Sequence, residues 1–184
     1  GNAGQNRLTR SFQDLVKDNW GKYFYIRDLK RNVYWSAAYK PVMHPYQAFK
    51  VIHGIGYSKF FQTIEDIESE LTIFVSAGDP VEIFHLKLTN QSAEKRELDV
   101  TSYAEWLLGF APDEHREFHK LFIDTSADLG ASTLYARKCL WGFADDKGRH
   151  NNIDWPYTAF MAVSEPLKSF DCDKETFIGM YRND

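Results

Sequence analysis

The chain has 184 residues, a formal net charge of −4 at pH 7 and an aromatic content of 16%. This length is enough for one domain with a sizeable hydrophobic core. Acidic and basic residues are intermixed, which argues against nucleic-acid binding, and no apolar run approaches the roughly 18 residues of a membrane-spanning helix. Since no secretory signal is evident either, we expect a domain that contacts neither nucleic acid nor membrane.

Apolar and polar side chains alternate with a period of two along most of the chain, which predicts β-strands. The opening residues, GNAGQNR, are typical of a flexible end. We therefore assign residues 1–21 to an N-terminal extension and residues 22–184 to one domain. The predicted strands are residues 22–28, 32–36, 47–54, 56–64, 67–75, 81–90, 96–109, 119–126, 132–138 and 157–164.

Only two segments resemble helices. One is a short turn near residues 112–118, and the other is DKETFIG, where Asp173 can cap the first turn and Gly179 can end the last one. Strands at a spacing of roughly 8–12 residues with short turns are typical of antiparallel sandwiches. The expected fold class is therefore all-β, an antiparallel sandwich with one or two short helical turns.

The segment HGIGYSKFF, residues 53–61, permits two interpretations. A Gly-x-Gly sequence can hold a phosphate when a helix follows it, because the helix N-terminus supplies free N–H groups. Here YSKFF follows, which has the pattern of a strand. We therefore interpret Gly54 and Gly56 as a corner of the sheet, with His53 fixing the turn.

Two other groups of residues could carry chemistry. His115 and His119 are four residues apart, but Arg116 stands where a zinc protease of this pattern needs glutamate, so we predict no metal site and no cofactor. Glu105 next to Trp106 could be a general acid beside a sugar-stacking ring, yet glycoside chemistry needs a second carboxylate across the scissile bond. A strand glutamate with a packed tryptophan is the simpler interpretation.

The cysteines and the one glycosylation sequon have structural interpretations. Cys139 and Cys172 show no zinc or redox spacing and are expected to be reduced and partly buried. Asn90-Gln91-Ser92 matches the sequon but is expected to form a hairpin turn, since no secretory signal accompanies it.

Taken together, the segments resemble a known domain. KYFYIRD, VYWS, HGIGYSKF, IESELTIFV, DPVEIFHLKLTN, LDVTSYAEWLLG and DKETFIG occur in the order seen in the N-terminal domain of glycoside hydrolase family 94, formerly glycosyltransferase family 36. The resemblance covers residues 22–179. It implies a galactose mutarotase-like β-supersandwich that precedes an (α/α)-barrel and continues past residue 179, so that the present chain resembles a domain truncated at its C-terminal end.

The resemblance also implies a function for a larger parent enzyme. Cellobiose, chitobiose and β-1,2-oligoglucan phosphorylases and cyclic β-1,2-glucan synthases belong to this family, and their catalytic acid and phosphate site lie in the barrel. We therefore expect a chain without catalytic residues of its own, from a parent that acts on β-glucan oligosaccharides and uses inorganic phosphate as a substrate. The expected partners are the barrel domain and a second copy in a homodimer. The parent would be cytoplasmic, or membrane-embedded if it is a cyclic glucan synthase.

The resemblance places the candidate sugar contacts after the AEWLLG strand. In cellobiose phosphorylases the matching stretch is Asn-Phe-Gln-Arg, whose polar residues reach the acceptor sugar, and here it is Glu117, Phe118, His119 and Lys120. Only the phenylalanine is shared, which argues against specificity for cellobiose. AEWLLG followed by a charged loop looks more like the β-1,2-glucan-active branch of the family. Two alternatives stay open: a free-standing carbohydrate-binding module, with Trp141 and Trp155 as stacking rings, and a structural dimerisation domain.

Overall fold

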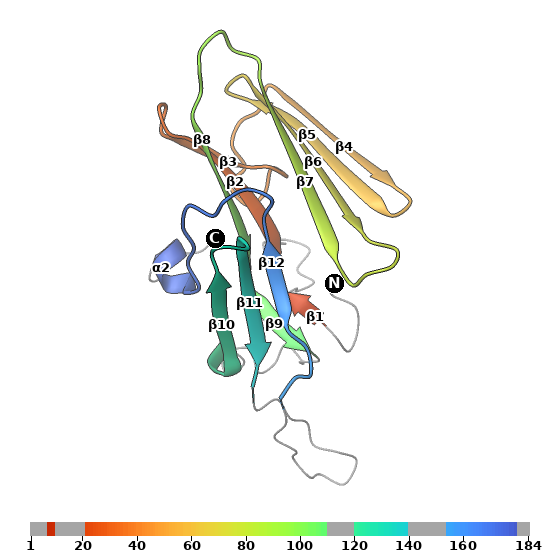
Figure 1. Cartoon of the computed structure of the whole chain (residues 1–184). Helices are drawn as coiled ribbons and strands as arrows, with labels where there is room; N and C mark the ends of the chain where they lie inside the picture. The colour runs from red at the N-terminus through yellow and green to blue at the C-terminus, as the bar shows by residue number, and fades with distance from the viewer. Residues whose placement is uncertain (1–6, 10–20, 110–119, 140–153, 180–184) are drawn as a thin grey trace. The chain divides into compact units, whose positions relative to one another are not determined.

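The computed structural model describes residues 7–9, 21–109, 120–139 and 154–179. The chain divides into two compact units: the first comprises Asp14–Ala104 with Gly1, and the second comprises Asn2–Gln13 and Glu105–Asp184. Each unit is built from antiparallel strands (Figure 1). The predicted fold class is therefore confirmed for the described residues, which hold one α-helix of five residues.

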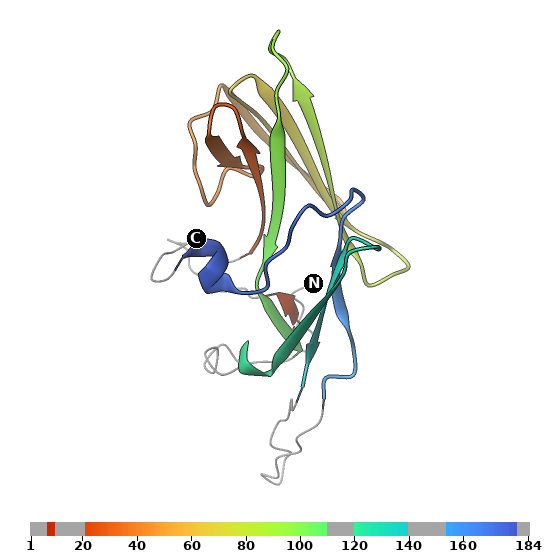
Figure 2. The same cartoon turned by 60° about the vertical axis from the view of Figure 1, so that its left-hand side comes forward.

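The first unit contains two antiparallel sheets. The smaller has the order β3-β2-β8 and the larger the order β4-β5-β6-β7, and the two form separate layers (Figure 2). Six predicted strands of this unit are confirmed, with ends that differ by no more than one residue, and β8 is the first part of the strand expected over residues 96–109. Their bounds are β2 Lys22–Asp28, β3 Val33–Ser36, β4 Ala48–Gly54, β5 Tyr57–Ile64, β6 Ile67–Val75, β7 Glu82–Asn90 and β8 Leu98–Ala104.

The core of the first unit lies between these two sheets. Ile26 and Trp35, from the smaller sheet, are fully buried and belong to the same cluster as Ile67 and Leu71 of the larger sheet. This arrangement follows from the alternation in β6, where Ile67, Ser69 and Leu71 are buried while Glu68 and Glu70 lie on the opposite face. Burial of these apolar faces is the main stabilising contribution to the sandwich.

The second unit holds two smaller sheets and the helix. One sheet pairs β1 (Arg7–Thr9) with β9 (Trp106–Gly109), and the other has the order β10 (Ile123–Asp128), β11 (Thr133–Lys138) and β12 (Ala159–Ala162). A 3₁₀-helix, η2 (Lys120–Phe122), precedes β10. The core cluster consists of Leu108, Ala136, Trp155 and Ala159.

Three local expectations differ from the structure. The strand expected over residues 96–109 is divided at Glu105 into β8 and β9, which belong to different sheets. Within β9, Leu108 and Gly109 adopt positive φ angles of 52° and 93°, so the end of this strand is irregular. The strand expected over residues 119–126 begins only at Ile123, after η2, and β1 lies within the segment assigned to the N-terminal extension.

The helix α2 (Lys174–Ile178) has the ends that the sequence predicts. An Oδ1 atom of Asp173 accepts a hydrogen bond from the backbone N–H of Glu175 at 3.1 Å, which satisfies one of the free donors of the first turn. Gly179 follows the last turn with a φ angle of 100°, a conformation that glycine adopts at little cost. The other helical prediction, near residues 112–118, lies outside the described residues.

Candidate functional site

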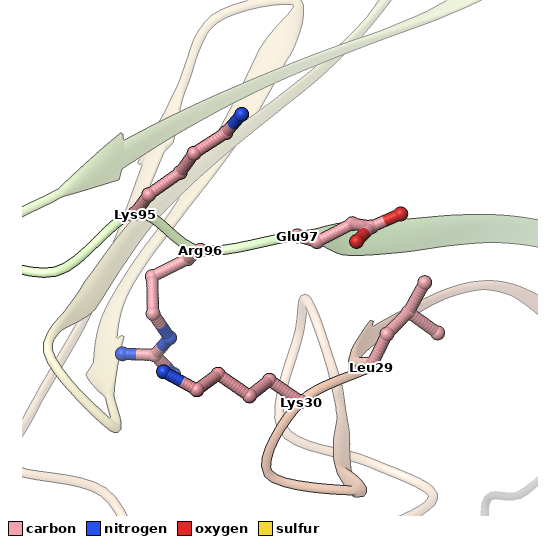
Figure 3. A pocket seen from close by; sticks show the side chains of 5 residues that line it. All are labelled: Leu29, Lys30, Lys95, Arg96 and Glu97. Carbon is pink, nitrogen blue, oxygen red and sulfur yellow. The ribbon is translucent and has the colours of Figure 1, made fainter.

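A hollow of about 360 Å³ opens in the first unit beside the turn between β2 and β3. Leu29 and Lys30 line it from this turn, and Lys95, Arg96 and Glu97 line it from the segment before β8 (Figure 3). The backbone N–H of Leu29 donates to the carbonyl oxygen of Glu97 at 3.0 Å, which holds the two segments together.

Arg96, one of the residues that line this hollow, forms a buried ion pair with Asp28. Its guanidinium lies 2.5 Å from the carboxylate of Asp28, and the side chains of the two residues are 2% and 0% exposed. Nη1 of Arg96 also donates to the carbonyl oxygen of Glu65 at 2.7 Å, and Glu65 belongs to the turn between β5 and β6. One arginine therefore connects three turns at the same end of the sandwich.

The environment of Asp28 lowers the pKa of its carboxyl group. Desolvation by burial acts to raise this pKa, but the hydrogen bond from the backbone N–H of Arg31 and the hydrogen bond and charge of Arg96 outweigh it. The backbone N–H of Arg31 lies 2.8 Å from Oδ1 of Asp28. The carboxylate consequently remains ionised at neutral pH and can compensate the charge of Arg96.

The rim of the hollow is charged but lacks catalytic chemistry. Lys95 and Arg96 extend to opposite sides of their segment (Figure 3), and Lys30 lies 3.5 Å from the carboxylate of Glu94 in an exposed pair, which contributes little to stability. Glu97 is the one carboxylate that lines the hollow, whereas glycoside cleavage by a carboxylate pair needs two. The lining residues can hold a polar group by hydrogen bonds but supply no nucleophile and base.

Most of the predicted sugar contacts fall where the chain is not described. Glu117, Phe118, His119 and Trp141 lie outside the described residues, as does His115 of the histidine pair. Lys120 is the first residue of η2. Of the four residues 117–120, the structure therefore describes only the backbone of Lys120. The assignment of this group to sugar contacts stays a prediction.

Trp155, the remaining candidate, packs inside the second unit. It is 6% exposed and belongs to the cluster with Leu108 and Ala136. The neighbouring Tyr157 is 58% exposed, and the centroids of the two rings are 5.3 Å apart. Tyr157 is therefore the accessible ring of the pair. Sequence reasoning missed it, because tyrosine is intermediate in burial and an isolated one carries no signal of exposure.

Glu105, between β8 and β9, is paired with a lysine and followed by a packed tryptophan, in agreement with the structural interpretation of Glu105 and Trp106. Its carboxylate accepts a hydrogen bond from Nζ of Lys174 at 2.7 Å, and its side chain is 17% exposed. Trp106 packs against the core cluster of the second unit. In the part of the chain that is described, no three His, Cys, Asp or Glu side chains are grouped so that they could hold a metal ion.

Lys138 is a buried basic group in the second unit. Its side chain is 1% exposed, and its Nζ donates to the carbonyl oxygen of Leu107 at 3.1 Å. Desolvation by burial lowers the pKa of this ammonium to about 8. Lys138 joins β11 to β9, and its burial makes it a structural group rather than an accessible nucleophile.

The corner at HGIGYSKFF confirms the structural interpretation of its glycines. Gly54 and Tyr57 are the last opposed residues of β4 and β5, and Gly56 has a φ angle of 80°. Nδ1 of His53 lies 2.9 Å from the hydroxyl of Ser58 across the corner. The ring of Tyr57 occupies the space where a side chain at position 54 would project, so the glycine is needed for close packing.

The remaining sequence predictions have mixed outcomes. Asn90, at the end of β7, accepts hydrogen bonds from the backbone N–H and the hydroxyl of Ser92, as in a turn. The expected hairpin is wrong, because β7 and β8 lie in different sheets. Cys139 and Cys172 are not joined by a disulfide, and Cys139 is half-buried as expected, whereas Cys172 is exposed.

Among the described residues, no helix has the length and apolarity needed to cross a membrane.

Comparison with known proteins gives a consistent set of matches. The family described as "Glycosyl hydrolase 94, supersandwich domain" matches residues 1–183. Solabiose phosphorylase from Paenibacillus borealis is 28% identical over 162 residues, which cover 87% of this chain and 19% of that protein. N,N'-diacetylchitobiose phosphorylase from Vibrio furnissii is 24% identical over 181 residues, covering 97% of this chain and 21% of that protein.

A third relative is much longer. The cyclic beta-(1,2)-glucan synthase NdvB from Rhizobium meliloti (strain 1021) is 28% identical over 187 residues, which cover 97% of this chain and 6% of the synthase. The chain thus spans about a fifth of the length of the two phosphorylases and a smaller share of the synthase.

Proposed function

The chain belongs to the glycosyl hydrolase 94 supersandwich family, and on this premise we propose that it is the non-catalytic β-domain of a larger glycoside phosphorylase or glucan synthase that acts on β-glucans. The observation that carries the proposal is the share of each relative that the chain covers, between 6% and 21% in the three proteins compared above. The transfer of a glucosyl unit between a β-glucan and phosphate then depends on the remainder of the parent enzyme.

The chemistry of the described residues is consistent with a domain that leaves catalysis to the remainder of the parent enzyme. The hollow beside Arg96 presents one carboxylate, and Glu105 is held by Lys174. A domain of this kind contributes by its shape: it would brace the (α/α)-barrel, take part in a homodimer and line the entrance for the acceptor sugar. A rigid β-sandwich suits this role because loops on a rigid scaffold keep polar side chains in fixed positions.

We assign the acceptor contacts to Glu117, Phe118, His119 and Lys120. The first three follow β9 in the chain, Lys120 is the first residue of η2, and η2 continues directly into β10. The backbone N–H of Cys139 donates to the carbonyl oxygen of Phe122 at 2.8 Å, so the segment that follows the group is fixed to the end of β11. Leu121, the next residue in the chain, is exposed.

The assignment can be tested in the full-length parent enzyme. His119→Ala and Lys120→Ala should each raise the KM for the acceptor sugar several-fold, because each removes a hydrogen-bond donor, while the KM for phosphate stays the same. Lys50→Ala, at an exposed position of β4, serves as the control and should change neither constant. Unchanged acceptor KM values in both variants would remove the entrance role.

A free-standing carbohydrate-binding module is the second candidate function. Tyr157 favours it, because this ring is 58% exposed next to Trp155. The two functions differ in what the gene encodes after this segment: an (α/α)-barrel supports the phosphorylase or synthase, and a stop codon supports the module. A dimerisation domain would form a stable dimer on a sizing column and show no glucan binding by titration.

A further inference from the structure

The loop between β3 and β4 carries a cluster of aromatic rings. Tyr39 and Tyr46, from the loop, surround Phe49 at the start of β4, and the three ring centroids are 5.4–5.7 Å apart. Tyr46 is 49% exposed, and Met43, in the same loop, is 54% exposed. We call Tyr39, Met43, Tyr46 and Phe49 the aromatic loop cluster. Its three rings pack together, and Met43 lies in the same loop, where its backbone N–H donates to the carbonyl oxygen of Tyr39 at 2.8 Å.

The backbone of this loop is in an unfavourable conformation at two bulky residues. Tyr39 has a φ angle of 75° and Met43 one of 53°, in the left-handed region that residues other than glycine, asparagine and aspartate seldom occupy. Met43 is also exposed, so core packing does not account for its conformation. Strained residues of this kind are concentrated at ligand-binding sites.

Hydrogen bonds hold the strained loop in one conformation. The backbone N–H of Tyr39 donates to the carbonyl oxygen of Ser36 at 3.1 Å, and that of Val42 donates to the Ser36 hydroxyl at 3.2 Å. Ser36 is buried, and its carbonyl oxygen also accepts from Nε2 of the buried Gln62 at 2.6 Å. The backbone N–H of Gln47 donates to the carbonyl oxygen of Thr63 at 2.8 Å. The cluster is therefore preorganised by the sandwich beneath it.

We propose that the aromatic loop cluster is a binding site for a neutral pyranose oligosaccharide, in which the rings contact the apolar C–H faces of the sugar. The choice of a β-linked gluco-oligosaccharide as the ligand rests on the proposed function. The polar groups around the rings suit its hydroxyl groups: the tyrosine hydroxyls can donate and accept hydrogen bonds, and exposed Lys40 follows Tyr39 in sequence.

A protein or peptide partner fits the same surface less well. Stable protein interfaces bury about 800 Å² on each partner, whereas the exposed part of this cluster comes mainly from two side chains, Met43 and Tyr46. A proline-rich peptide docks in a groove lined by several aromatic rings, whereas Tyr46 is the one exposed ring of this cluster and Tyr39 and Phe49 are half-buried. A small ligand with an apolar face is the better match.

The proposal is tested by titrating the ¹⁵N-labelled 184-residue chain with cellopentaose, with a β-1,2-linked glucopentaose and with a decaproline peptide. We expect saturable shifts of the amide resonances of residues 37–49 with at least one of the two sugars. No saturable shift with either sugar, shifts confined to the surroundings of Tyr157, or saturation by the peptide alone would overturn the assignment.

Matched variants then separate the cluster from other exposed rings. Tyr46→Ala should weaken sugar binding roughly tenfold, the effect of losing one ring contact. Tyr34→Ala removes a tyrosine of similar exposure, 56%, from β3 of the same unit, and should leave the dissociation constant unchanged. Equal effects of the two substitutions would contradict the proposal.

The variant Met43→Asn distinguishes the loss of a sugar contact from a loss of binding caused by unfolding. Asparagine tolerates a left-handed backbone better than methionine, so the thermal midpoint of this variant should stay the same or rise. Its affinity for the sugar should nevertheless fall several-fold, because the exposed apolar side chain is gone. Unchanged affinity in both Met43→Asn and Tyr46→Ala would overturn the site.

Failure of this site and failure of the proposed function give different results. The titration uses the isolated chain and reports residues 37–49, whereas the entrance role is measured by the acceptor KM of His119 and Lys120 variants in the parent enzyme. Sugar binding at the loop with an unchanged acceptor KM would retain the site and remove the entrance role. The opposite pair of results would remove the site alone.

Discussion

Asp28 and Arg96 form a buried ion pair in which the guanidinium lies 2.5 Å from the carboxylate. Three turns of the first unit meet at this pair. Asp28 ends β2 and accepts the backbone N–H of Arg31, Arg96 precedes β8, and Nη1 of Arg96 binds the carbonyl oxygen of Glu65 between β5 and β6. The pair thus connects the two sheets of the sandwich at one end.

Removal of Arg96 should destabilise the chain strongly. Arg96→Ala leaves the carboxylate of Asp28 buried without its cation and frees the carbonyl oxygen of Glu65, and breaking a buried pair in this way costs about 3–5 kcal/mol. The measurement is the free energy of unfolding in urea. Arg27→Ala, which removes an exposed hydrogen bond to Asn32, is the control and should cost less than about 1 kcal/mol.

Acid should destabilise the native chain through the same carboxylate. The folded-state pKa of Asp28 lies below the ordinary value of 3.8, so the unfolded chain takes up a proton first as the pH falls. The contribution of Asp28 is therefore complete above about pH 5 and is lost as the pH falls through the lowered folded-state pKa. Unfolding curves of the wild type and Asp28→Asn between pH 6 and pH 3 should converge as the pH falls. A constant difference would contradict the assignment.

Local sequence patterns predicted the first unit well because its strands obey a single physical rule. In β6, the polar and apolar residues alternate and one face is buried, so both the strand and its core-facing side follow from the sequence. Asp173 and Gly179 were likewise recognisable, since capping depends on the chemistry of single residues.

Other features depended on tertiary contacts that no local pattern reveals. The division at Glu105 separates β8 and β9 into different sheets, although the residues on either side continue a similar alternation. The burial of Trp155 depends on packing with Leu108 and Ala136, which are distant in sequence. The aromatic loop cluster was equally hidden, because the strained conformation of Met43 leaves no signature in composition.

Alanine at position 54 should be tolerated only if the ring of Tyr57 moves away. A Cβ atom at position 54 would overlap Cε1 and Cζ of Tyr57, and because Tyr57 is 42% exposed, its ring can turn into solvent. We expect Gly54→Ala to lower the free energy of unfolding by about 1 kcal/mol, at the low end for overpacking.

Two companion variants test the cause of this loss. In Gly78→Ala the new Cβ meets no atom within 4 Å, so a small effect is expected there. Tyr57→Ala removes the overlapping ring, so adding Gly54→Ala to it should cost almost nothing further. Additive losses in the double variant would show that the ring is not the reason for glycine at position 54.

Lys138 should make the chain more stable as the pH rises above 8. Burial lowers its folded-state pKa to about 8 from 10.5, so between these values the unfolded chain binds more protons than the native one, and stability increases with pH. The shift corresponds to about 3 kcal/mol across this range. Lys138→Met, which keeps the buried volume without the charge, should lack the increase in urea unfolding experiments at pH 7.5 and pH 10. Arg137→Met, at the exposed neighbouring position, should retain it, and an equal pH response in all three proteins would mean that another group titrates.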